Sequence, residues 1–102
     1  MTARGGQVWK LELFVLRLDH WQDRDPDVSD ELRSLVEAWL VTRYANPYEG
    51  MFQEAGQPNL WSGKVPGSED GCGHAVACSY WIFELTHTVK CNDFAILGEP
   101  IV

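Results

Sequence analysis

The residues best suited to metal chemistry in this sequence are two cysteine–histidine pairs in its C-terminal third. Cys72 and His74 are separated by one residue, and His87 and Cys91 by three. Thiolates and imidazoles are good zinc ligands, but zinc ligands usually come in short repeated spacings such as C-x2-C, and none occurs here. The two pairs also fall at opposite ends of a predicted β-hairpin. We therefore predict no metal site and no other cofactor.

Nucleophilic catalysis and phosphate binding by a glycine-rich loop are also disfavoured. Cys78 would need a histidine beside it and a lowered thiol pKa, yet its position in a predicted strand turns it toward the core. The segment 66–73 (PGSEDGCG) lacks the lysine and the following helix of a phosphate-binding loop. Three cysteines are an odd number and too few for the disulfide framework of a small secreted protein, so we expect a reducing compartment, the cytoplasm.

Charge is a further signal in the composition. Fifteen acidic and eight basic residues give a formal net charge of −7, which repels phosphate backbones and disfavours general nucleic-acid binding. Six of the acidic residues fall in one stretch: Asp19, Asp23, Asp25, Asp27, Asp30 and Glu31. Such a stretch is typical of a solvated loop and helix start, where carboxylates favour the helix dipole. A docking face for a basic partner and a divalent-ion site are the alternatives.

The chain has the size and composition of one folded domain. With 102 residues, 45% of them hydrophobic and five of them tryptophan, residues 1–102 can bury a core large enough to fold unaided. Residues 1–7 are expected to form a flexible tail. No stretch approaches the roughly 18 apolar residues of a membrane span. We therefore expect a single domain without a membrane-spanning helix.

Hydrophobic periodicity predicts a strand and then a long helix in the first half of the chain. From Val8 to Leu18 the apolar residues alternate and then become continuous, which predicts a strand buried first on one face and then on both. A helix is predicted from about Val28, after several N-cap residues, to Asn46-Pro47, where the proline should end it. Its apolar stripe comprises Leu32, Leu35, Val36, Trp39 and Leu40.

The second half of the chain predicts three strands. Residues 47–58 suit a short helical turn or an ordered loop, and segments 59–65, 74–85 and 88–97 read as strands, the last two joined by a tight turn. One face of that hairpin would carry Val76, Cys78, Tyr80, Ile82, Val89, Cys91 and Ala95. The predicted fold class is therefore α+β: an N-terminal strand, a long amphipathic helix with a short helical turn, and a three-stranded antiparallel meander, forming one sheet with the helix packed on one face.

This order of elements resembles that of the RelE/ParE toxin superfamily, over about Val8 to Leu97, as a diverged member. The segments NLWSGKVPG and GHAVACSYWIFELTHTVKC are similar to its pattern of a hydrophobic strand, a glycine, a basic residue, a strand ending near a tyrosine, and a hairpin into the next strand. The resemblance implies a toxin held inactive by a cognate antitoxin. Ribonuclease members of the superfamily cut messenger RNA on the ribosome without a metal, whereas gyrase-poisoning relatives keep the fold and do different work.

The resemblance also implies candidate site residues. His74 stands where the superfamily usually has an arginine at the opening of the third strand, and Lys64 lies on the preceding strand, so these two are the candidate catalytic residues. A histidine there could act as general acid or base, because imidazole titrates close to neutral pH. Lys64 and Lys90 could hold a phosphate or stabilise the charge that develops on it. The candidate binding residues are Lys90, Arg43, Trp61 and Tyr80.

Two functions from different classes follow. The first is a RelE/ParE-like toxin, either a metal-independent, ribosome-dependent mRNA endoribonuclease or a relative with another target, whose partners would be an antitoxin and the ribosome with its mRNA. The alternative is a non-catalytic, acidic protein-interaction module on the same scaffold, which would bind a basic protein through its acidic face and exposed tryptophans. A homodimer through an unpaired edge strand is open to either.

Overall fold

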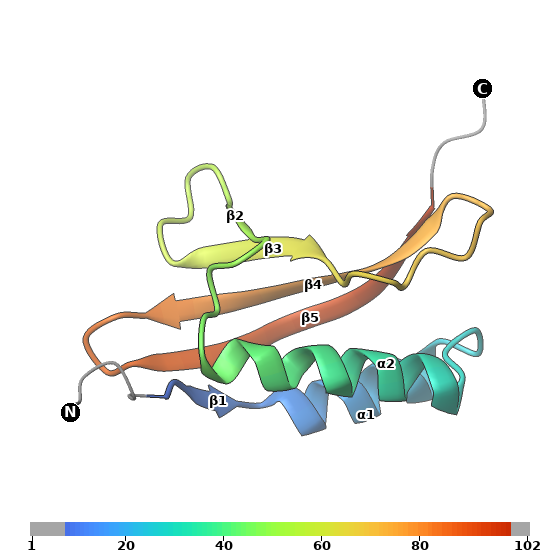
Figure 1. The fold of residues 1–102 in the computed structure, drawn as a ribbon, viewed down its shortest axis with the longest axis horizontal. Helices are drawn as coiled ribbons and strands as arrows, with labels where there is room; N and C mark the ends of the chain where they lie inside the picture. Colours follow the sequence, from blue (N-terminus) through green and yellow to red (C-terminus); the bar gives the residue numbers. More distant parts are fainter. Residues whose placement is uncertain (1–7, 99–102) are drawn as a thin grey trace.

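The computed structural model describes residues 8–98 as two helices packed on one side of a five-stranded sheet (Figure 1). The helices are α1 (Phe14–Arg24) and α2 (Asp30–Val41), and a short 3-10 turn, η2 (Thr42–Tyr44), follows α2. The strands are β1 (Lys10–Glu12), β2 (Phe52–Gln53), β3 (Leu60–Lys64), β4 (His74–Phe83) and β5 (Thr88–Gly98). The tail predicted at 1–7 lies outside the described residues.

The sheet is mixed, with the strand order β1-β5-β4-β3-β2. β1 runs parallel to β5, and the other neighbours are antiparallel. The predicted α+β class and the three C-terminal strands are confirmed, but the sheet has five strands rather than four. No helix within residues 8–98 is long and apolar enough to cross a membrane.

The first helix corrects the strand predicted from Val8 to Leu18. β1 ends at Glu12, and Leu13 adopts a left-handed backbone conformation, with φ of 69°, that turns the chain into α1 at the next residue. From there the buried side chains are spaced by four and three residues, as one face of a helix requires. They are Phe14, Leu18 and Trp21.

α2 confirms the predicted amphipathic helix. The Ser29 hydroxyl caps its start by accepting a hydrogen bond from the Leu32 backbone N–H at 3.0 Å, and the acidic side chains of the first turn favour the helix dipole. The helix passes into η2 and ends before Asn46-Pro47, as expected. Its core-facing residues are Val36 and Leu40, with Leu32 and Trp39 partly buried beside them.

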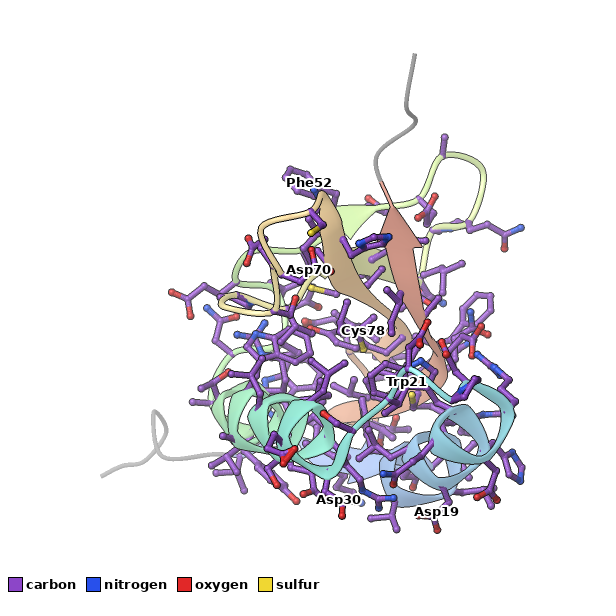
Figure 2. The ribbon with its side chains drawn as sticks, turned by 90° about the vertical axis from the view of Figure 1, so that its right-hand side faces the viewer. Asp19, Trp21, Asp30, Phe52, Asp70 and Cys78 are labelled. Carbon is purple, nitrogen blue, oxygen red and sulfur yellow. The ribbon has the colours of Figure 1, made fainter. Side chains whose placement is uncertain are left out.

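The two helices form one layer beneath the sheet, where a single helix was predicted. Figure 2 shows both helices on the same side, with Trp21 of α1 and Cys78 of β4 in the interior between the layers. The Trp21 ring stacks on Phe94 of β5, with centroids 5.5 Å apart. The Arg24 guanidinium closes the same edge, because its Nη2 donates to the Phe94 carbonyl at 2.7 Å and to the Asp93 carboxylate at 2.8 Å.

A bulge in β5 decides which of its side chains reach this core. Ser79 pairs with Asp93, but the next residue, Tyr80, pairs with Cys91, so the intervening residue of β5 is unpaired and the alternation reverses. Phe94 therefore faces the helices, which corrects the prediction of Ala95 for that face. The remainder of the predicted face is buried as expected: Val76, Cys78, Tyr80, Ile82, Val89 and Cys91.

Residues 47–58 form a loop, one of the two alternatives predicted for them, and also supply the edge strand β2. β2 pairs with β3 through Phe52 opposite Ser62 and Gln53 opposite Trp61. The loop crosses so close to β3 that a Cβ at Gly63 would lie 2.8 Å from the Gly50 carbonyl oxygen. Only glycine fits at this crossing without a backbone shift.

The bulge makes a testable difference between two positions of β5 that are three residues apart. Phe94→Ala should lower the free energy of unfolding by about 3–5 kcal/mol, because it empties a fully buried aromatic site. Leu97→Ala, at a half-exposed position beyond the bulge, should change it by less than about 1 kcal/mol. Urea unfolding followed by circular dichroism measures both, and equal losses would contradict the register described here.

Two phenols, Tyr80 buried and Tyr48 partly buried, predict how stability changes at alkaline pH. Burial raises the pKa of Tyr80 to about 12. Burial, together with the Glu84 carboxylate that accepts a hydrogen bond from the Tyr48 hydroxyl, raises the pKa of Tyr48 to about 12. Since phenols in unfolded chains have a pKa of about 10, this stabilisation is complete below that pH and is lost as the pH rises toward 12. Ultraviolet titration should show two late phenols, and one in Tyr48→Phe. Ionisation of every tyrosine together near pH 10 would contradict the burial.

Candidate functional site

The sheet face that points away from the helices is the candidate site, and we call it the open face. Side chains alternate across each strand, so the register identifies the rows that project from it. The rows are Lys64–Ala77–Ala95, Ser62–Ser79–Asp93, Leu60–Trp81–Lys90 and Phe83–Thr88–Lys10. Figure 2 shows Phe52 of β2 on this far side of the sheet.

Basic residues are divided between the two layers by type. The three lysines of the sequence, Lys10, Lys64 and Lys90, all project from the open face, where each is exposed. The described arginines belong instead to the helices and η2: Arg17, Arg24, Arg33 and Arg43. Among residues 8–98, lysine is therefore the basic residue type that projects from the open face.

Two of the acidic residues near the open face already have polar partners. The Asp93 carboxylate accepts a hydrogen bond from Arg24, and the Glu54 carboxylate accepts one from the Ser62 hydroxyl. Glu12 pairs in register with Lys90. The helical layer, by contrast, holds seven acidic side chains: Asp19, Asp23, Asp25, Asp27, Asp30, Glu31 and Glu37. The helical layer therefore carries a large group of carboxylates, and the four described arginines belong to the same layer.

Aromatic side chains alternate with the lysines on the open face. Trp81 lies beside Lys90 in one row, Phe83 shares the next row with Lys10, and Phe52 is 75% exposed at the β2 edge. A shallow hollow lies between Phe52 of β2 and Leu97 of β5. Its floor is formed by small side chains, namely Ser62, Ala77, Ser79 and Ala95. The face thus offers flat apolar rings, flexible cations and space above the strands.

The structure does not bring the two candidate catalytic residues together. Lys64 is opposite Ala77 and projects from the open face. His74 is two residues before the buried Val76 on β4, so its side chain projects toward the helical side. His74 lies in a separate pocket beside the start of α2, with Ser29 among its lining residues. Lys64 and Lys90 do share the open face, two rows apart.

His74 has an acidic partner that sequence reasoning missed. Its Nδ1 lies 2.9 Å from an Asp70 carboxylate oxygen, and both side chains are about half exposed. The other Asp70 oxygen accepts the backbone N–H groups of Cys72 at 2.8 Å and His74 at 3.1 Å, and these bonds hold the pKa of Asp70 below its ordinary value. The four-residue spacing of Asp70 and His74 is the sequence feature that could have indicated this pair. The pair orients the imidazole on the helical side of the sheet, away from the lysines of the open face.

The other predicted binding residues lie in or beside the core. Tyr80 is fully buried and donates its hydroxyl proton to the Pro47 carbonyl. Arg43 is 3% exposed and donates to the Glu49 carbonyl at 2.6 Å, with its guanidinium over the Trp39 ring. Trp61 packs edge-on against Tyr48, with centroids 5.0 Å apart. These side chains hold the β2 and β3 connections and do not project from the open face.

The cysteine and histidine side chains of residues 8–98 do not form a cluster of metal ligands. Among residues 8–98 no three side chains of histidine, cysteine, aspartate or glutamate are placed to hold a metal ion. Burial raises the pKa of the Cys78 thiol well above its ordinary value, and the neighbouring Cys91 adds to the effect. His87 is stacked on the Trp9 ring with centroids 3.7 Å apart. Cys78 is buried in the core, as its strand position predicts.

Comparison with known proteins gives a match at the level of fold. Neither a protein-family model nor a curated protein matches the sequence. Among solved structures, the chain is similar to a double arginine-to-alanine variant of the Escherichia coli toxin RelE in its free state, with a TM-score of 0.59 and 14% sequence identity. The similarity covers 86% of this chain and 82% of that one. The chain therefore has a RelE-like fold.

Proposed function

We propose that this chain is the toxin component of a RelE-like toxin–antitoxin pair and that it acts by binding single-stranded RNA on its open face. One observation carries the proposal: all three lysines and three aromatic side chains share the sheet face that the helices leave uncovered. The RelE-like fold supports the toxin assignment.

The lysines answer the objection that an acidic protein should repel RNA. A net charge of −7 acts at long range, but screening at physiological salt limits the reach of a charge to about 8 Å. Three lysines project from the open face, where the acids in register are Glu12 and Asp93, and Asp93 already pairs with Arg24. Flexible lysines of this kind suit phosphates that follow an irregular single strand.

The aromatic side chains supply the second element of single-strand binding. Bases stack on exposed rings, with each stacked base contributing about 1–3 kcal/mol regardless of sequence. Trp81 lies between Leu60 and Lys90, so a base on its ring would bring a phosphate within reach of that lysine. Phe52 could support a further base at the opposite border of the hollow. This arrangement favours unpaired RNA over a duplex, whose bases are already stacked.

Ribosome-dependent cleavage is a narrower version of the same proposal, and the geometry supports it less well. Metal-independent cleavage needs a proton acceptor beside the bound phosphate. His74 projects from the other side of the sheet and its Nδ1 contacts Asp70, so it is not available to RNA on the open face. The proposed activity is therefore RNA binding and not RNA cleavage by His74 and Lys64.

The second candidate function is the non-catalytic, acidic interaction module. It is favoured by the concentration of carboxylates on the helical layer and by the absence of arginine from the described part of the open face. It predicts that a basic protein binds the helices and that substitutions on the open face have no consequence. The two functions are therefore separated by which surface is sensitive to mutation.

RNA affinity provides the biochemical test. A fluorescently labelled single-stranded RNA of about 12 nucleotides should bind the wild-type chain, and Trp81→Ala should weaken binding by about 1–3 kcal/mol. Lys64→Ala and Lys90→Ala should each lower the slope of log affinity against log salt by about 0.7. Arg33→Ala removes the same charge from the helical layer and should leave the affinity unchanged. Equal effects of all four variants, or no binding at all, would rule out the open face.

Growth provides the cellular test. Induction of the wild-type chain without a partner gene should stop growth, and the Lys64→Ala/Lys90→Ala double variant should restore it at equal soluble expression. Primer extension on abundant messenger RNAs then distinguishes RNA binding from RNA cleavage, because only a ribonuclease leaves new 5′ ends. Normal growth at high soluble expression of the wild-type chain would contradict the toxin proposal.

A further inference from the structure

The outer side of the helical layer carries an apolar groove that no described element covers. It lies where α1 begins and α2 ends, and Leu40 and Glu37 contribute to its lining. Five apolar side chains of the groove are substantially exposed: Leu13 at 40%, Val15 at 67%, Leu16 at 47%, Val41 at 64% and Tyr44 at 45%. A contiguous exposed apolar patch of this kind marks an interaction surface more often than scattered single residues do.

The groove continues along the line between α1 and α2, and we call this whole line the seam. Beyond the groove the seam becomes acidic. The Arg33 guanidinium spans it, 2.7 Å from the Asp19 carboxylate and 3.4 Å from that of Glu37, so a single cation serves two acids. Farther along, Gln22 of α1 donates to the Asp30 carboxylate of α2 at 2.9 Å. Figure 2 shows Asp19 and Asp30 on the outer side of the layer, away from the sheet. The surface is therefore apolar at one end and negative at the other.

We infer that this seam binds an amphipathic helix of a partner protein whose apolar stripe fills the groove and whose adjoining turns carry lysine or arginine. α1 and α2 have 11 and 12 residues, long enough to support about three turns of such a helix. Charge complementarity selects the basic partner. It also disfavours a second copy of this chain, because each copy has a net charge of −7 and would meet the acidic end of the other.

The inference concerns a different surface from the open face, so it survives or fails independently of RNA binding. Val15 and Val41 belong to the helices, whereas the lysine and aromatic rows project from the sheet on the opposite side. If the chain is a toxin, an antitoxin could occupy the seam while the open face stays accessible. If it is an interaction module, the seam is its principal site.

Three helical peptides of about 15 residues test the inference on the full chain. The first has a leucine stripe at one end and lysines at the other, the second has glutamate in place of lysine, and the third has the first composition scrambled so that the stripe is lost. The first should bind and shift the amide resonances of α1, α2 and η2. The second and third should bind at least about tenfold more weakly, a difference of roughly 1.4 kcal/mol or more.

Substitutions at highly exposed positions make the test specific without unfolding the protein. The double variant Val15→Glu/Val41→Glu should lose at least about tenfold in affinity for the first peptide. Phe52→Glu, equally exposed on the open face, is the matched control and should bind normally. Equal binding of the scrambled peptide, or an unchanged affinity of the double variant, would overturn the inference. Self-association that the double variant abolishes would also overturn it, in favour of a second copy.

Discussion

The register between β4 and β5 is the constraint on which the rest of the structure depends. The unpaired residue between Cys91 and Asp93 reverses the alternation of β5, and this places Phe94 in the core. Phe94 then joins the layers, because its ring contacts Trp21 and Phe14 of α1 while Arg24 bonds to its carbonyl. Without the reversal, α1 would meet Ala95, and an aromatic ring would lie on the face that now carries the lysines.

Two surfaces of different chemistry result from this packing. Arginine is used within the helical layer, where its planar group satisfies several fixed acceptors at once, as Arg43 does with the Glu49 carbonyl and Arg33 with two carboxylates. Lysine is used on the open face, where a mobile and well hydrated charge suits an irregular ligand. Because the surfaces lie on opposite sides of the core, one ligand can bind to each without competition.

The sequence predicted the elements with long, unambiguous periodicity and missed those that depend on one or two residues. α2 and the β4–β5 hairpin were predicted because each repeats its apolar spacing several times. α1 was read as strand, since its apolar residues continue the alternation of β1 and only the left-handed Leu13 separates them. The bulge has no local sequence signal, so the sequence places Ala95 on the wrong face. The separation of His74 from Lys64 has a different origin: the β3–β4 register pairs Lys64 with Ala77, and His74, three residues along β4, lies on the other face.

Whether RNA binds the open face can be decided by recording amide resonances during titration with a short single-stranded RNA. We expect the perturbed amides to lie in β3, β4 and β5 around Lys64, Trp81 and Lys90, with those of α1 and α2 unchanged. Perturbations confined to the helices, or an unchanged spectrum at saturating RNA, would contradict it.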